Sequence, residues 1–485
     1  MRDSLLRLAN FIDGDFRAPA SGRYLPVTEP ATGKVYAEVP DSTTLDVDAA
    51  VSAAHAARSA WSATAPSARA RLLRRLADLI ESRLDALAEE ESRDTGKPVR
   101  VARQIDIPRA VANFRYFASM AETWGSESHT GELGVLNYTL RQALGAVACI
   151  SPWNLPLYLL TWKIAPALAT GNTVVAKPSE ITPVTAWLLG ELAQEAGLPP
   201  GVLNIIHGSG PACGQPLVVH PRIKAVSFTG STATGAAIAT ATAAQFKKLS
   251  LELGGKNATV VFADCDFERT VHECVRAAFS NQGQICLCGS RILIERPLYA
   301  RFRDAFVAAA QALKVGDPRA ADSDLGALVS SDHLQKVLSY IALAHEEGGR
   351  LLCGGERLAL EGRCREGYFL APTVFDQLDA HCRVNQEEIF GPVVTLQPFD
   401  DDTQALAYAN ASRYGLASSV WTRDLDRAHR FAAQVETGLV WINTWMARDL
   451  RTPFGGIKHS GLGREGGSDA MRFFTEAKNV GLWVG

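Results

Sequence analysis

Short runs of β-branched residues alternate with helical patterns in the middle of this chain, and this alternation most constrains its fold. The runs occupy residues 146–150, 173–176, 224–228 and 259–262. Apolar residues at helical spacing lie between them, for example over residues 184–196. Strands that alternate with helices in this way form βαβ units, whose parallel strands are buried by helices. The sequence therefore predicts an α/β fold with a mostly parallel, doubly wound sheet.

Patterns outside this region complete the predicted organisation. Leucine and isoleucine residues at helical spacing predict a helix over residues 67–94, which Thr95-Gly96 would end. A second region of strand and helix patterns extends from about residue 255 to residue 455. Residues 131–141 and 479–483 have the composition of strands, and such isolated strands need a partner edge.

Length, charge and hydropathy exclude several classes of protein. A chain of 485 residues is long enough for two or three domains, and 47% hydrophobic with 21% charged residues are typical of a globular protein. The net charge of −3 gives no reason to expect binding to nucleic acid or to an anionic membrane surface. Neither an apolar run of spanning length nor a signal-peptide pattern is found, so we expect no membrane association.

The cysteines argue against disulfides and metal sites. Nine cysteines occur without CxxC pairs and without a Cys/His cluster at metal-ligand spacing. An odd number without such pairs disfavours a disulfide framework and a structural zinc site. We therefore expect no metal and a cytoplasmic location, where thiols stay reduced. Most of these thiols are expected to be small buried hydrophobic groups.

One cysteine differs from the others in its surroundings. Cys286 follows a Gly-bearing turn, Gln-Gly-Gln at 282–284, and Glu252 ends an apolar strand upstream, beside Gly254-Gly255. A thiol can attack a carbonyl carbon and a carboxylate can activate water, so the pair is suited to a covalent route through a thioester. Taken singly, the two residues are equally consistent with a buried inert thiol and a solvated strand end.

Other segments indicate an oxyanion site and a nucleotide site. The amide of Asn154 follows a predicted strand and can donate to an oxyanion, although an asparagine between two prolines is usually a turn residue. A GxGxxG fingerprint is missing, but Gly230-Ser231 begins a predicted helix and offers N–H groups to a pyrophosphate. Glu180 follows the predicted strand at 173–176, and its carboxylate can accept from hydroxyl groups and would repel a phosphate.

Together these segments resemble the aldehyde dehydrogenase superfamily from about Phe11 to Val480. The shared motifs appear in the expected order as Pro-Trp-Asn at 152–154, Lys-Pro-Ser-Glu at 177–180, Phe-Thr-Gly-Ser at 228–231, Glu-Leu-Gly-Gly-Lys at 252–256, Gln-Gly-Gln-Ile-Cys at 282–286, Glu-Glu-Ile-Phe-Gly-Pro at 387–392 and Pro-Phe-Gly-Gly at 453–456. The resemblance implies a Rossmann-type NAD-binding domain, an α/β catalytic domain and a β arm that joins homodimers or homotetramers. These parts would comprise 1–123 and 143–253 for the NAD-binding domain, 254–455 for the catalytic domain, and 124–142 and 465–485 for the arm.

The resemblance also implies a role for each site residue. Cys286 would be the nucleophile, Glu252 the base for the hydrolytic water, and Asn154 the oxyanion donor together with the Cys286 backbone N–H. Cys288 would be a wall residue, and a helix starting after the turn would lower the pKa of the Cys286 thiol. The implied NAD-binding residues are Lys177 and Glu180 at the adenosine ribose, Gly230 and Ser231 at the pyrophosphate, Glu388 at the nicotinamide ribose, and Phe390 and Trp153.

An arginine-bearing segment at 443–454 points to the substrate. It is similar to the branch of the superfamily that oxidises 2-hydroxymuconate and 2-aminomuconate semialdehydes. Such substrates carry a distal carboxylate, which a guanidinium binds in a fork. The candidate anchors are Arg448 in this segment and Arg109, which lies on the helix that borders the tunnel in the family. Arg451 is the reserve candidate, Arg115 is expected to be structural, and any of them can be an ordinary solvated arginine.

The leading hypothesis is therefore NAD-dependent, non-acylating oxidation of a muconic semialdehyde to the acid. A dehydrogenase for another aldehyde, such as an aliphatic, betaine or succinic semialdehyde, is the alternative among enzymes. An acyl-CoA-forming enzyme is disfavoured by Glu252, because CoA-acylating relatives lack a base there. A non-catalytic binding or structural protein on the same fold is disfavoured by the intact set of catalytic residues.

Overall fold

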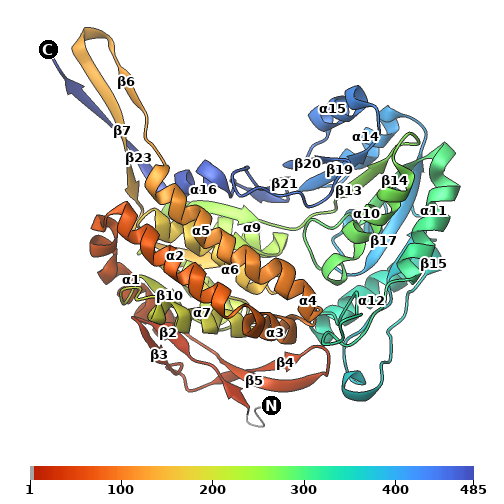
Figure 1. Ribbon diagram of the computed structural model, residues 1–485, viewed down its shortest axis with the longest axis horizontal. Helices are drawn as coiled ribbons and strands as arrows, with labels where there is room; N and C mark the ends of the chain where they lie inside the picture. The colour runs from red at the N-terminus through yellow and green to blue at the C-terminus, as the bar shows by residue number, and fades with distance from the viewer. Residues whose placement is uncertain (1–4) are drawn as a thin grey trace.

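Two layered α/β units and a projecting β hairpin make up the protein in Figure 1, a computed structural model that describes residues 5–485. Residues 1–4, with which the predicted NAD-binding segment begins, lie outside the described residues. Each unit is built around its own sheet.

The first sheet has the strand order β22-β12-β11-β8-β9-β10-β2-β3. Its strands are β22 (Gly461–Leu462), β12 (Lys248–Glu252), β11 (Ile223–Thr229), β8 (Ala146–Ile150), β9 (Thr173–Lys177), β10 (Leu203–Ile205), β2 (Asn10–Ile12) and β3 (Asp15–Arg17). The strands from β12 to β10 pair in parallel, whereas β22 and β2 pair antiparallel at the two sides. The runs at 146–150, 173–176 and 224–228 are therefore confirmed as parallel strands.

Helices cover both faces of this sheet. Along β8, Val147 and Cys149 belong to a hydrophobic cluster on one face, whereas Ala146 and Ala148 belong to a second cluster on the other face. The first cluster includes α2 (Pro66–Ser82), α5 (Ile107–Thr123), α6 (Pro156–Ala169) and α7 (Val184–Glu195), and the second includes α1 (Thr44–Ala63). A strand buried on both faces has a continuous apolar sequence, as these runs do. The predicted doubly wound fold is confirmed.

The second sheet has the order β15-β16-β17-β14-β13-β19-β20. Its strands are β15 (Arg350–Cys353), β16 (Thr373–Asp376), β17 (Val393–Phe399), β14 (Arg291–Glu295), β13 (Ala258–Val261), β19 (Ala417–Trp421) and β20 (Leu439–Ile442). All neighbouring strands are parallel except for β15. The helices associated with this sheet are α10 (Phe267–Phe279), α11 (Arg296–Gln311), α12 (Ser331–Glu346), α14 (Asp402–Asn410) and α15 (Leu425–Gln434). The run at 259–262 is β13, which lies inside this sheet between β14 and β19.

The helix predicted over residues 67–94 is two helices. The first, α2, ends at Ser82, and α3 (Leu84–Thr95) begins after Arg83, whose ψ of 22° is not helical. The apolar periodicity continues through this break because both helices bury a face, but they bury it against different neighbours: α2 packs on α5, whereas Glu91 of α3 accepts from Thr185 at the start of α7. Gly96 ends α3 in the left-handed conformation, as predicted.

The hairpin projects away from both units (Figure 1). What we call the hairpin is a three-stranded sheet of β6 (Ser128–Thr130), β7 (Val135–Ala143) and β23 (Thr475–Trp483). The strand β23 pairs antiparallel with the whole of β7. The stretch paired with β7 thus starts at Thr475 and not at residue 465. Residues before it form α16 (Gly467–Phe473), whose Ala470 and Met471 are buried in the core beside α6. The predicted arm is shorter at this end, because apolar side chains hold α16 against the first unit.

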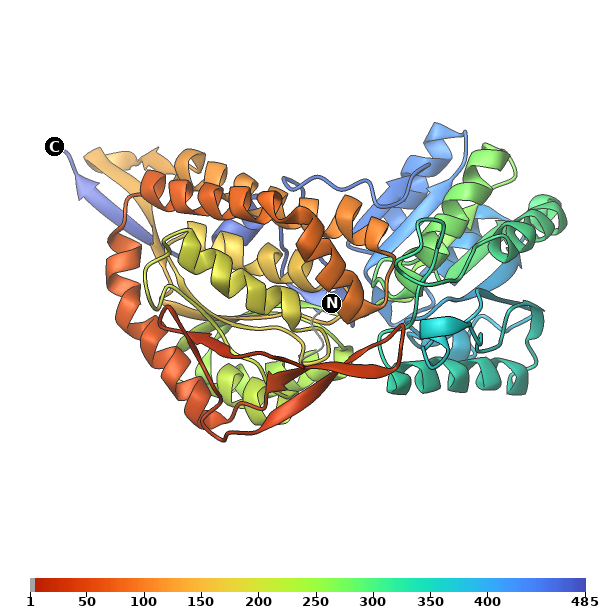
Figure 2. The same cartoon turned by 60° about the horizontal axis from the view of Figure 1, so that its bottom comes forward.

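A small sheet near the N-terminus connects the two units. It contains β1 (Leu6–Arg7), β5 (Lys34–Pro40) and β4 (Tyr24–Glu29), and Figure 2 shows it along the lower front of the molecule. The turn between β4 and β5 touches the second unit, where the backbone N–H of Tyr368 donates to the carbonyl of Pro30. Within residues 5–485, no helix is both long and apolar enough to cross a bilayer.

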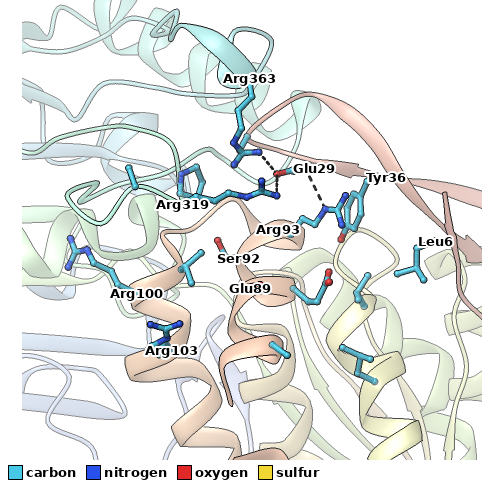
Figure 3. Close-up of a pocket in the computed structure, with 18 of the residues that line it drawn as sticks. Leu6, Glu29, Tyr36, Glu89, Ser92, Arg93, Arg100, Arg103, Arg319 and Arg363 are labelled. Carbon is cyan, nitrogen blue, oxygen red and sulfur yellow. Dashed lines mark hydrogen bonds and ion pairs between the residues drawn. The ribbon is translucent and has the colours of Figure 1, made fainter. Parts of the chain in front are cut away.

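A cavity of about 960 Å³ lies beside this sheet, between α3 and a loop of the second unit (Figure 3). Arginines dominate its polar lining, and Glu29 is their shared partner: it lies 2.7 Å from Arg363, 3.6 Å from Arg93 and 3.8 Å from Arg319. None of the candidate catalytic residues lines this cavity. It is part of the contact between the two units.

Candidate active site

The loop that carries Cys286 has an unusual backbone. It follows α10 and begins with a short 3-10 turn (Ser280–Gly283), in which Asn281, Gln282 and Gly283 all have positive φ values of 52°, 56° and 71°. A Cβ atom on Gly283 would collide with the carbonyl of Gly391. Glycine is therefore required at this position, and the turn directs the chain so that Cys286 lines a small cavity in the second unit.

The environment of Cys286 raises the pKa of its thiol. Burial is the main cause, and the carboxylates of Glu388 and Glu252 add to it, while Arg448 acts in the opposite direction. The expected helix start after the turn is wrong, because the chain passes from residue 290 into β14. An extended strand supplies no dipole to the thiol. The buried thiol is held in its protonated form until a base removes the proton.

Glu252 lies at the end of β12, next to the Gly254-Gly255 turn. Its side chain is buried, and neither carboxylate oxygen has a hydrogen-bond partner within residues 5–485. Burial and then the nearby carboxylate of Glu465 raise its pKa well above the usual range, and the ammonium of Lys163 opposes this. A carboxylate with a raised pKa is suited to take a proton near neutral pH, as a base for water must.

Asn154 lies at the end of β8 and faces the cysteine loop. Its side-chain amide donates to the carbonyl of Gln284 at 2.9 Å, two residues before the thiol. An amide NH₂ has two N–H groups, so the second is available to another acceptor. The structure thus brings Asn154 to the loop of Cys286, as an oxyanion donor requires, although the sequence separates them by more than one hundred residues.

The predicted nucleotide-binding residues gather at the ends of β9 and β11. Lys177 and Glu180 form an ion pair of 3.2 Å. Ser231 caps α9 (Thr232–Thr242), since its Oγ accepts from the backbone N–H of Thr234 at 3.2 Å. A Cβ atom on Gly230 would collide with the ring of Phe228, so a larger residue here would require that ring to move. The open helix N-terminus and the partly exposed Glu180 carboxylate fit a pyrophosphate and a ribose.

Glu388 lies closer to the nucleophile than the sequence indicated. Its carboxylate accepts from the backbone N–H of Gly255 at 2.9 Å, and a Cβ atom on Gly254 would collide with it. Both Glu388 and Cys286 line the small cavity. The two glycines of the Gly-Gly turn therefore make room for this carboxylate.

Phe390 and Trp153 belong to an aromatic group at the edge of the same cavity. Phe390 has a positive φ of 64°, and its ring meets that of Trp153 edge to face at a centroid distance of 5.3 Å. The ring of His333 completes the group, 4.9 Å from Trp153, and its Nε2 lies 2.7 Å from the Phe390 carbonyl. His333 has no motif of its own in the sequence, and for this reason it was not predicted.

The two candidate carboxylate anchors come together. Arg109 and Arg448 both stack on the rings of Tyr158 and Trp162, at distances of 4.9–6.0 Å from the guanidinium carbon to the ring centroids. Arg448 donates to the Tyr158 hydroxyl at 2.9 Å. In Arg109, Nε donates to Asn113 at 3.1 Å, while the buried Nη2 has no hydrogen-bond partner in the described part of the chain.

The neighbouring arginines have other partners. Arg451, the reserve candidate, is paired with Asp449 at 2.6 Å and is exposed. Arg115 is bound by Asp78 and Glu81 on the surface of α2, which is the structural role expected of it. Tyr158 and Asn113, which hold the two anchor candidates in place, were missed from the sequence because they belong to ordinary amphipathic helices.

Comparison with known proteins agrees with this geometry. Residues 16–480 match the model of the aldehyde dehydrogenase family. The chain is 52% identical to a 2-aminomuconic semialdehyde dehydrogenase of Danio rerio, over 98% of each chain. It is 45% identical to a 2-hydroxymuconic semialdehyde dehydrogenase of Pseudomonas sp. strain CF600, over 98% of this chain and 99% of the relative. An NAD⁺ complex of an aldehyde dehydrogenase from Bacillus cereus superposes with a TM-score of 0.96 at 39% identity, over 99% and 97% of the two chains. The chain therefore belongs to the aldehyde dehydrogenase family.

Proposed function

We propose that this protein oxidises 2-aminomuconate or 2-hydroxymuconate 6-semialdehyde to the corresponding acid, with NAD as the electron acceptor. One observation carries the choice of substrate: two guanidinium groups, Arg109 and Arg448, meet on one aromatic platform, and one of them has a buried N–H without a partner among the described residues. Two neighbouring positive charges repel each other unless an anion lies between them. The names of the two relatives described above, a 2-aminomuconic and a 2-hydroxymuconic semialdehyde dehydrogenase, support a substrate with such a carboxylate.

The residues around the thiol support a covalent mechanism. The Cys286 sulfur attacks the aldehyde carbon, its proton passes to a nearby base, and the developing oxyanion accepts from the free N–H of Asn154 and the backbone N–H of Cys286. NAD, when bound, would supply the acceptor for the hydride that leaves the adduct carbon, and Cys286 would then hold the acyl group as a thioester. Glu252 then takes a proton from water, and the hydroxide that forms releases the acid and regenerates the thiol.

The two units would divide this work. We propose that the first unit holds the NAD through Lys177 and Glu180 at the adenosine ribose and through Gly230 and Ser231 at the pyrophosphate. Glu388 would hold the nicotinamide ribose, and the rings of Trp153 and Phe390 would flank the nicotinamide. The second unit carries Cys286. The aldehyde would reach the thiol from the side on which the two arginines lie.

We also propose that the hairpin joins copies of this chain into homodimers or homotetramers in the cytoplasm. Leu133, Leu482 and Trp483 on the hairpin expose 90%, 51% and 72% of their surface, which is costly for apolar side chains in water. The free state of all nine cysteines supports a reducing compartment. Light scattering of the full chain and of a chain truncated after residue 474 measures the role of the hairpin, and an unchanged mass would contradict it.

Steady-state kinetics with a panel of aldehydes tests the substrate assignment. The purified protein is given NAD and 2-hydroxymuconate 6-semialdehyde, and the decay of the substrate chromophore and the formation of NADH are followed. Benzaldehyde, betaine aldehyde and succinic semialdehyde are compared under the same conditions. We expect the highest kcat/KM with the muconic substrate. A preference for betaine aldehyde, which is a cation, or for benzaldehyde, which is uncharged, would contradict the assignment.

Substitution of the two arginines locates the carboxylate site. We expect Arg109→Met and Arg448→Met each to raise KM for the muconic substrate by about 10- to 100-fold, because each removes a charge-assisted hydrogen bond. The effect on benzaldehyde, which has no carboxylate, should be small. Arg451→Met is the matched control, since its guanidinium is occupied by Asp449. Equal effects on both substrates would contradict the anchor.

A further inference from the structure

A buried ion pair lies directly behind Asn154. Lys97 and Asp106 are both fully buried, and the Lys97 ammonium donates to the Asp106 carboxylate and, at 3.0 Å, to the backbone carbonyl of Asn154. The pair thus ends on the backbone of the residue whose side chain faces the cysteine loop. Neither residue belongs to a motif that the sequence singled out.

The two charged residues are held on rigid supports. The carbonyl of Lys97 accepts from the Ser92 hydroxyl at 2.6 Å, and a Cβ on the preceding Gly96 would collide with Ala327. Asp106 ends a π-helical turn (Ala102–Asp106) at the start of α5, and such turns are frequent at functional sites. The ammonium can therefore occupy few positions other than the one beneath Asn154.

A second contact ties the same carbonyl to the cysteine loop. The side-chain amide of Asn281 lies 3.2 Å from the carbonyl of Asn154 and 3.2 Å from the carbonyl of Gln284. The Asn154 amide donates to this same Gln284 carbonyl at 2.9 Å. Asn154 and the chain two residues before Cys286 are therefore joined by a closed set of hydrogen bonds, and Lys97 holds this set from behind.

Stability alone is a poor reason for this arrangement. Removing two charges from water is costly, and the attraction between them often does no more than offset that cost. Apolar residues of the same size would pack this site at least as well. What the ion pair adds is a defined direction for the Asn154 backbone, and an oxyanion donor needs its N–H placed to within a few tenths of an ångström.

We propose that Lys97, Asp106 and Asn281 are positioning residues that fix Asn154 relative to the Cys286 sulfur. This inference rests on the oxyanion role of Asn154 in the proposed function. Lys97 and Asp106 fix the backbone of Asn154, and Asn281 couples that backbone to the cysteine loop. None of the three touches the substrate, so their effect on the reaction passes through Asn154.

A double-mutant cycle tests this dependence. Asp106→Asn, Asn281→Gly and Asn154→Ala are made singly, and each of the first two is combined with Asn154→Ala. Glycine replaces Asn281 because its φ of 52° would strain an alanine. We expect Asn154→Ala to lower kcat by about 100-fold, as the loss of one oxyanion donor does. Asp106→Asn and Asn281→Gly should each lower kcat by about 10-fold through misplacement of the donor.

Three readouts separate positioning from a general loss of structure. When a positioning residue is substituted, kcat should fall, whereas KM and the Kd for NAD should change by less than about twofold. Added to Asn154→Ala, Asp106→Asn or Asn281→Gly should cause little further loss, since the group they position is already missing. Lys97→Arg keeps the charge and should retain more activity than Lys97→Met. If Asp106→Asn does not fold, Asn281→Gly carries the same test.

Gln282→Gly is the matched control. Gln282 is buried, has a φ of 56° and is adjacent to Asn281, but its amide donates to the carbonyl of Ala327 and not to Asn154. Any factor by which Gln282→Gly lowers kcat should multiply in full with the factor for Asn154→Ala when the two are combined. If the losses of Asp106→Asn and Asn281→Gly also multiply in full, the positioning role is wrong while the oxyanion role stands. If Asn154→Ala retains its kcat, both are wrong.

Discussion

Cys286 shows how the surroundings of one residue set its chemistry. The sequence predicts a nucleophile here by its motif and expects a lowered pKa of the thiol, whereas the structure gives a raised pKa. Burial removes the thiolate from water, and Glu388 contributes a negative charge that no local pattern placed near the thiol. Desolvation and charge depend on residues brought in from elsewhere in the chain, so neither could be read from the motif.

The charge of Glu388 gives a prediction for the thiol. A neighbouring carboxylate disfavours the thiolate, so Glu388→Gln should lower the pKa of Cys286 and shift the pH profile of its alkylation toward lower pH. The measurement is the rate of iodoacetamide labelling at Cys286 without NAD, read by mass spectrometry between pH 7 and 10. Glu387→Gln is the control, because Arg383 and Tyr340 already bind that carboxylate. An unshifted profile in Glu388→Gln would contradict the prediction.

Most candidate site residues could be named from the sequence, but the contacts between them could not. Cys286, Glu252 and Asn154 lie in motifs, and the structure brings Asn154 and the cysteine loop into contact. Arg109 and Arg448 were chosen singly from the charge of the expected substrate. That they share the rings of Tyr158 and Trp162 follows from the packing of α5 on α6 and of the later loop on both.

At the scale of elements, the turn before Cys286 is tightly constrained at Gly283. Gly283→Ala would place a methyl group against the Gly391 carbonyl and in a left-handed conformation. We expect it to lower the unfolding temperature strongly and to abolish NADH formation. Gly348→Ala is the control: its φ is 82°, but nothing lies within 4 Å of the added Cβ, so only the backbone cost of about 1–2 kcal/mol remains. Equal losses of stability would show that the close approach does not matter.

Elements were predicted well where one apolar face repeats. The parallel strands and the helix at 184–196 were found because burial imposes a regular apolar pattern on them. The break at Arg83 and the packing of α16 on the first unit were not found, since a change of helix direction leaves the apolar period intact. The π-turn before Asp106 also lacks a local signature.

At the scale of the whole molecule, Glu29 joins the two units. Its carboxylate at the end of β4 is buried and meets Arg93 of the first unit and Arg319 and Arg363 of the second (Figure 3). Glu29→Gln leaves these guanidinium groups without their shared charge and should destabilise the protein by about 1–3 kcal/mol. Thermal unfolding measures the loss. In the control Glu38→Gln, an exposed pair with Arg7 is lost, and we expect a change below about 0.5 kcal/mol. Equal shifts in unfolding temperature would contradict the role of Glu29.

The sequence by itself determined the fold class, the family and the residues that can do chemistry, because strand periodicity and short motifs are local properties. The tertiary structure alone decided which of these residues act on one another. Lys97 and Asp106 lie under Asn154, Glu388 lies against the Gly-Gly turn, and Arg109 lies beside Arg448. Burial, charge and hydrogen-bond geometry arise from contacts between distant parts of the chain, and those contacts exist only once the two units have packed together.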